Sequence, residues 1–217
     1  MGQKINPQLF RLGTTAKWQS RWFNTKHYGQ WLIEDHRIRA LATERFKKAA
    51  IAEVEIERFA NATHLIIWTA RPGVIIGRGG AGVEAFKKEV AKLTNTTVNV
   101  DIHEVRDPES NAAIIATNIA EQIERRIPFR RIIRQSVDAA KQARVQGIRI
   151  VISGRLNGAE IARTEMFSFG KVPLHTIKQP IDYALRTAYT TYGTIGIKVW
   201  VLRSEAAEAA LAGDTNS

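Results

Sequence analysis

Three segments in the first half of the chain alternate between apolar and polar residues, with the two-residue period of a half-buried β-strand. They span residues 51–58, 63–69 and 97–105, and a turn at Asn61-Ala62 separates the first two. In the first segment three glutamates alternate with Val54 and Ile56, which suits one buried and one solvated face. We therefore predict three strands in this half of the chain.

Apolar residues recur at spacings of three and four over residues 28–50, which is the period of an amphipathic helix. Arg71-Pro72-Gly73 ends the second strand, and a short apolar turn at residues 74–76, which we count as a helix, follows. After a glycine-rich loop, a further helix is predicted over residues 80–93. The predicted order is helix, strand, strand, helix, glycine loop, helix, strand.

The second half of the chain begins after a linker at residues 106–109. Two helices are predicted there, over residues 111–126 and 129–146, and strands over residues 147–154, 165–172 and 196–203. Residues 181–192 fit two structures, because Thr and Tyr favour a strand whereas Asp-Tyr-Ala-Leu-Arg can begin a helix. We predict a strand for this segment.

These patterns divide the chain into four parts. Residues 1–16 lack either regular period and form a basic N-terminal arm, and residues 17–106 contain the first group of elements. Residues 107–204 contain the second group, and residues 205–217 form an alanine-rich tail that we expect to be mobile.

Composition identifies the class of partner. The chain has 217 residues, a net charge of +11 and a pI of about 10.2. This excess of positive charge favours a polyanion such as RNA as the binding partner. It has no apolar run of eighteen residues and no signal segment, so we expect a cytoplasmic protein without membrane contact. The five histidines lack metal-ligand spacing, and there is no cysteine or clustered acid–base set. We therefore expect no metal, cofactor, small-molecule substrate or enzymatic activity.

The basic arm allows two interpretations. It carries Lys4 and Arg11 and is followed by Lys17. Terminal segments of this kind are commonly frayed, but the apolar residues at positions 9, 10 and 12 favour an arm that becomes ordered on a partner. In the second interpretation Lys4 and Arg11 bind RNA phosphates.

The segment Val-Ile-Ile-Gly-Arg-Gly-Gly-Ala-Gly-Val at residues 74–83 contains the most informative motif of the chain. Glycine lets a backbone approach a ligand closely and adopt positive φ, and exposed N–H groups at a helix start attract anions. The Gly-x-x-Gly element, which consists of Gly77, Arg78, Gly79 and Gly80, is therefore predicted to bind phosphates.

A dinucleotide is the alternative ligand of this loop. Gly77, Gly79 and Gly82 satisfy the G-x-G-x-x-G spacing, and Asp101 follows about twenty residues later. That fingerprint needs a complete buried strand leading directly into the glycines. Here Pro72-Gly73 leaves only three apolar residues before the loop, so we prefer the backbone of an RNA strand.

A second basic cluster lies after Pro128. On the helix predicted there, Arg130, Arg131 and Arg134 share one face, and no acidic residue occurs between Glu124 and Asp138. This comb of three arginines is predicted to bind RNA phosphates. Arg155 and Arg163, near two glycine turns, are further candidates for RNA contact, although both also fit ordinary surface charges.

Residues 75–83 resemble the I-G-x-x-G-x-x-I/V signature of the KH domain, with Val83 as the closing aliphatic residue. KH domains clamp about four nucleotides of single-stranded backbone with this loop. The order of elements is similar to that of the type II form. The resemblance implies an N-terminal KH domain that has a three-stranded sheet with helices.

Motifs along almost the whole chain resemble the family of bacterial small-subunit ribosomal protein three. They comprise residues 1–7, 11–13, 69–73, 153–165, 172–176 and 190–200, and together they extend to about Leu202. The resemblance implies an α+β protein, in which the KH domain is followed by a second α+β domain with two helices packed on a mainly antiparallel sheet. The tail after Leu202 matches no pattern of this family.

The same resemblance implies a function in the head of the small ribosomal subunit. Members of the family bind ribosomal RNA, contact small-subunit proteins ten and fourteen, and line the channel through which messenger RNA enters, where they assist the separation of its secondary structure. By position, the arginines and lysine of that channel correspond to Arg130, Arg131 and Arg134, the last of which is often Lys in the family. A standalone KH regulator of messenger RNA is the alternative function.

Overall fold

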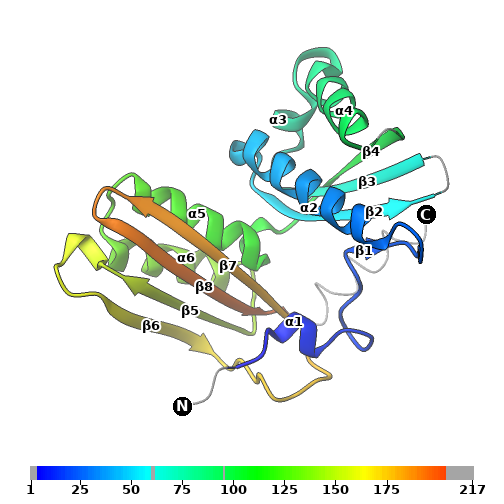
Figure 1. The fold of residues 1–217 in the computed structure, drawn as a ribbon. Coiled ribbons are helices and arrows are strands. Elements are labelled where there is room, and N and C mark those ends of the chain that lie inside the picture. Colours follow the sequence, from blue (N-terminus) through cyan, green and yellow to red (C-terminus); the bar gives the residue numbers. More distant parts are fainter. Residues whose placement is uncertain (1–3, 60–61, 95, 204–217) are drawn as a thin grey trace. The chain divides into compact units, whose positions relative to one another are not determined.

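The computed structural model describes residues 4–59, 62–94 and 96–203, and it divides them into two compact units (Figure 1). One unit is Trp18–Arg106. The described residues on either side of it in the sequence form the other unit. The N-terminal arm thus belongs to the unit built by the second half of the chain.

The sheet of the first unit contains the three predicted strands and a short additional one. Its strands are β1 (Ser20–Arg21), β2 (Ile51–Arg58), β3 (Ala62–Thr69) and β4 (Thr97–Glu104), in the order β1-β2-β3-β4. The β2–β3 pair is antiparallel, whereas β1–β2 and β3–β4 are parallel. With only two residues, β1 is too short to show a period in the sequence.

Three helices accompany this sheet, namely α2 (Tyr28–Arg45), α3 (Pro72–Ile76) and α4 (Ala81–Thr94). Ile56 of β2, Ile67 of β3 and Val90 of α4 are completely buried in one apolar core, as the alternating pattern of the strands predicts. Phe86 of α4 meets Phe46, just after α2, edge to face at a centroid distance of 5.2 Å. The predicted order helix, strand, strand, helix, loop, helix, strand is confirmed.

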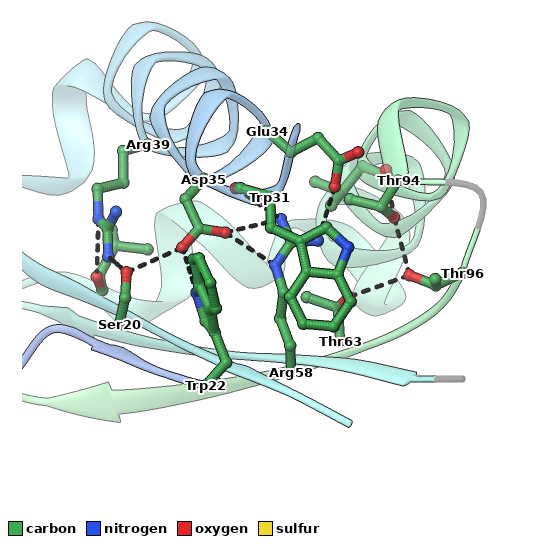
Figure 2. A network of polar contacts seen from close by, with 12 residues as sticks. Ser20, Trp22, Trp31, Glu34, Asp35, Arg39, Arg58, Thr63, Thr94 and Thr96 are labelled. Carbon is green, nitrogen blue, oxygen red and sulfur yellow. Dashed lines mark hydrogen bonds and ion pairs between the residues drawn. The ribbon is translucent and has the colours of Figure 1, made fainter. Parts of the chain in front are cut away.

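A buried carboxylate joins α2 to two strands of the sheet (Figure 2). Asp35 is fully buried and accepts hydrogen bonds from Nε and Nη2 of Arg58 on β2, at 2.9 and 2.7 Å. It also accepts hydrogen bonds from Ser20 Oγ of β1 and from Trp22 Nε1, both at 2.8 Å. With four donors on one carboxylate, the buried charge is well compensated.

The sheet of the second unit is entirely antiparallel, with the order β6-β5-β8-β7. Its strands are β5 (Gly147–Gly154), β6 (Arg163–Gly170), β7 (Ile181–Thr190) and β8 (Gly193–Leu202). Helices α5 (Ala112–Glu124) and α6 (Phe129–Gln142) pack on the face of the sheet that carries Ile150, Ile197 and Val199 (Figure 1). The prediction of a strand at the ambiguous residues 181–192 is confirmed by β7.

Some predicted segments differ from the structure or lie outside it. The strand expected at residues 165–172 is β6, which begins and ends two residues earlier. The linker contains a single turn of 3₁₀ helix at Pro108–Ser110. The tail 205–217 and Asn61 of the predicted turn lie outside the described residues.

The N-terminal arm is ordered on its own protein. A short helix, α1 (Pro7–Phe10), packs against β7, and the Arg11 that follows it is 1% exposed. Nε of Arg11 donates a hydrogen bond to the carbonyl oxygen of Gln179 at 2.7 Å, and Nη2 donates one to that of Thr176 at 2.9 Å. Burial lowers the pKa of the guanidinium. The predicted RNA contact of Arg11 is therefore inconsistent with the fold, because protein carbonyls occupy its donors.

The burial of Asp35 leads to a prediction about stability. Replacing Arg58 with Met leaves the Asp35 carboxylate buried without its cation, which should lower the free energy of unfolding by about 3–5 kcal/mol. Urea unfolding followed by tryptophan fluorescence measures this, since Trp18, Trp22 and two further tryptophans lie in the first unit.

Arg45→Met is the matched control. Arg45 pairs with Glu89 at the surface, and its side chain is 30% exposed, so its removal should cost no more than about 1 kcal/mol. If both substitutions lowered the free energy of unfolding equally, the buried pair of Asp35 and Arg58 would have no special role.

Candidate nucleic-acid interface

The Gly-x-x-Gly element forms a tight, exposed connection between α3 and α4. Three of its residues have positive φ, with values of 68° for Gly77, 60° for Gly79 and 82° for Gly80. These are conformations that favour glycine, because a side chain there would be strained. Gly77, Arg78 and Gly79 are all exposed, so the main chain of the loop is accessible to a ligand.

A fourth glycine allows the two helices to meet. A Cβ atom on Gly82, in the first turn of α4, would lie 2.4 Å from the carbonyl oxygen of Ile75 in α3. No real Cβ contact is that short, so only glycine permits this approach. The backbone of α4 therefore starts directly against the end of α3, and the loop between them has to be short.

The electrostatics of the loop favour an anion. The N–H of Ala81 donates to the carbonyl oxygen of Arg78, but the next N–H groups of α4 have no partner within the helix, and the helix dipole adds positive potential at this end. Arg78 is exposed between the glycines and has no ion pair in the described part of the chain. The arrangement can therefore bind phosphate through main-chain N–H groups and one guanidinium.

The dinucleotide alternative does not fit this geometry. The loop follows a helix, α3, rather than the strand that the fingerprint requires. Asp101, the residue at the spacing of a ribose ligand, lies within β4, and its carboxylate is 2.7 Å from Nε2 of His64 on the neighbouring strand.

The arginine comb lies in the first turns of α6. Ile132 and Ile133 are buried in the core of the second unit, as the helical spacing predicts. Arg130, Arg131 and Arg134 are exposed on the other side of the helix, and the side chain of Arg130 is 73% exposed. Three guanidinium groups are therefore held on a rigid element with access to solvent.

Arg163 joins this comb through contacts that the sequence did not indicate. Glu165 of β6 lies 3.2 Å from Nε of Arg163 and 3.9 Å from Nη2 of Arg130. Both guanidinium groups lie 5.9 Å from the ring centroid of Phe129. Because α6 and β6 are far apart in the sequence, no local spacing could have revealed this grouping of two arginines, one carboxylate and one ring.

The other predicted RNA contacts are distributed over the second unit. Arg155 donates hydrogen bonds from Nε to the carbonyl oxygen of Ala159, at 2.8 Å, and from Nη1 to that of Tyr192, at 3.1 Å. It thus stabilises the turn after β5, in addition to any contact with a ligand. Lys4 is exposed in the arm.

Metal-binding clusters and membrane-spanning helices are two other features that the described residues lack. In them, no cluster of three or more His, Asp or Glu side chains could hold a metal ion. Within the same residues, every helix is too short or too polar to cross a membrane.

Comparison with known proteins matches each half of the chain to a known domain family. The sequence profile of the KH domain matches residues 37–110, and that of the C-terminal domain of ribosomal protein S3 matches residues 119–201. Small ribosomal subunit protein uS3 of Syntrophomonas wolfei is 49% identical over 205 residues, which cover 94% of this chain and 90% of that protein. The uS3 protein of Koribacter versatilis is 48% identical over 210 residues, or 97% and 94% of the two chains.

The close approach at Gly82 leads to a second prediction. Gly82→Ala should separate α3 from α4 and lower the free energy of unfolding by about 1–3 kcal/mol, the usual cost of overpacking. Urea unfolding of the full chain measures the change.

Gly29→Ala is the control. Its Cβ would meet no atom within 4 Å in α2, so the substitution should be neutral or stabilise by up to about 1 kcal/mol. A Gly82→Ala protein as stable as the Gly29→Ala protein would show that the close approach is unimportant.

Proposed function

Because this chain belongs to the family of small ribosomal subunit protein uS3, we propose that its KH loop binds ribosomal RNA and that its arginine comb lines the path of incoming messenger RNA. Membership of the family makes it a ribosome-bound, RNA-binding structural protein of the cytoplasm rather than an enzyme. Small-subunit proteins ten and fourteen are its proposed protein neighbours. Membership also argues against a standalone KH regulator.

The geometry of the loop is the observation that carries the RNA-binding proposal. Gly77, Gly79 and Gly80 expose main chain in conformations that favour glycine, directly before the N-terminus of α4. Phosphate groups of an RNA strand can then approach N–H groups without a side chain in between. Arg78 supplies a guanidinium that can pair with one of the phosphates.

The proposed action of the comb on messenger RNA is mechanical. Arg130, Arg131 and Arg134 present forked donors from a helix whose opposite side is anchored in a core. Such groups can hold the phosphates of two strands apart without recognising bases. The sequence has no nucleotide-hydrolysis motif, so the energy for strand separation comes from translocation of the message.

A test of the loop replaces Gly79 and Gly80 together with Asp. Two carboxylates next to phosphate should weaken binding of the full chain to small-subunit ribosomal RNA. They should also reduce the salt dependence of binding, by about 0.7–0.9 in the logarithmic slope for each phosphate that the protein no longer neutralises. Filter binding over a series of salt concentrations measures both.

The control is the corresponding double substitution with Asn, which has nearly the same shape and tolerates positive φ equally well but adds no charge. Affinity that falls equally in both proteins would indicate backbone strain, and unchanged affinity in the Asp protein would refute binding at the loop.

A test of the comb replaces Arg130, Arg131 and Arg134 with Ala in ribosomes. Translation through a stable hairpin should slow by up to roughly tenfold, which corresponds to about 1.4 kcal/mol in the barrier, because no guanidinium then holds the phosphates of the separated strands. Elongation rates on a matched unstructured message should not change.

Ribosomes that carry Lys at the same three positions are the control for charge and should retain most of the activity. Equal rates of the Ala ribosomes on both messages would contradict the proposed action.

A further inference from the structure

The connection between β6 and β7 is held in place by the N-terminal arm. This connection, residues 171–180, contains no helix or strand and passes beside α1 (Figure 1). The guanidinium of Arg11, just after α1, is surrounded by five carbonyl oxygens, each within 3.4 Å of one of its nitrogens. We call this group the carbonyl cage. One belongs to the arm and four to the connection, and they are those of Pro7, Pro173, Leu174, Thr176 and Gln179.

The cage is unusual because it contains no carboxylate. A buried guanidinium is costly unless its donors are satisfied, and here main-chain dipoles alone satisfy it. Its planar fork of donors fixes carbonyls that belong to different turns of the connection. Arg11 therefore determines the conformation of residues 173–179.

The start of the connection is fixed independently. A Cβ atom on Gly147 would lie 2.2 Å from the carbonyl oxygen of Lys171, and one on Gly170 would lie 2.1 Å from that of Gln146. Two glycines thus press the backbone at Lys171 against the start of β5. The connection is held at its first residue and again along its middle.

All charged side chains of this fixed connection are basic, and its other exposed side chains are Thr176 and Ile177. Lys171, His175 and Lys178 are exposed, and the sequence has no acidic residue between Glu165 and Asp182. Both of these flanking carboxylates are engaged elsewhere. Glu165 pairs with Arg163, and Asp182 accepts a hydrogen bond from Arg203 Nη2 at 3.0 Å and another from the N–H of Ala112 at 2.8 Å.

We infer that the connection between β6 and β7 is a further RNA-binding site, which binds backbone phosphates through Lys171 and Lys178, and that Arg11 is its positioning residue. The inference rests on the proposed function, since it assumes that the protein binds ribosomal RNA. A polyanion fits better than a protein surface, because the exposed groups are mostly cations and polar side chains on an irregular backbone. Arg11 thus acts on RNA through the loop that it fixes.

The first experiment measures RNA affinity against salt concentration for the full chain with Lys171 and Lys178 both changed to Gln. Small-subunit ribosomal RNA is the ligand. With two fewer phosphates neutralised, the logarithmic salt slope should fall by about 1.4–1.8 and binding should weaken. The control changes Lys47 and Lys48, exposed residues of the other unit, to Gln, and this removes the same charge.

The second experiment uses Arg11→Lys, which keeps the charge but replaces five forked donors with three on one atom. Hydrogen exchange of residues 172–180 should become faster, and RNA affinity should fall although the net charge is unchanged. Arg37→Lys, on the exposed side of α2, should change neither quantity. A purely structural role for Arg11 would speed up exchange but leave RNA affinity at its original value.

The outcomes separate this inference from the proposed function. If the changes at Lys171 and Lys178 affect binding no more than those at Lys47 and Lys48, while the Asp substitutions at Gly79 and Gly80 still weaken it, the inference is wrong and RNA binding by the KH loop stands. If none of these substitutions changes the affinity, the proposed function itself fails.

Discussion

The Gly-x-x-Gly loop, which we propose binds phosphate, depends on the close approach of α3 and α4 at a position without a side chain. Gly82 lies where any Cβ would collide with the carbonyl oxygen of Ile75. Because the helices meet there, only four residues connect them, and three of these must adopt positive φ. The accessible main chain and the helix N-terminus that follow from this constraint are what a phosphate backbone requires.

The two units bury a guanidinium in different ways, and each arrangement fixes a segment that has little regular structure. In the first unit, carboxylates compensate Arg58, and the same Asp35 holds the segment around β1. In the second unit, Arg11 is compensated by carbonyl groups alone. Ion pairing suits a position between a helix and a strand. Carbonyl binding suits a loop, where main-chain oxygens lack partners in a helix or sheet.

Most of the fold could be predicted from the sequence, because the information was local. Strands β2, β3 and β5 alternate visibly, Pro72 and Pro128 mark breaks, and the glycine spacing identified the loop. The bounds of β2 and β5 agree with the prediction. The alternation in residues 181–192 was weaker, but the β-branched and aromatic residues favoured the correct structure.

The remaining features depended on residues that are far apart in the chain. Strand β1 has two residues and owes its place to its pairing with β2 and to the hydrogen bond between Ser20 and Asp35. The grouping of Arg130 with Arg163 requires α6 and β6 to be adjacent. Arg11 looked like a surface cation because a sequence cannot show carbonyl groups that converge from a distant loop. The basic charge of the arm was evident from the sequence, but its location in the fold was not.

The carbonyl cage also determines when the N-terminal arm can fold during synthesis. Four of its five oxygens belong to residues made 162 to 168 positions after Arg11. At about 5–20 residues per second, the arm leaves the ribosome roughly ten to thirty seconds before its binding partners exist. The arm is thus translated well before it can reach its folded position. A newly made molecule completes this part of its surface only after residues 173–179 have been released.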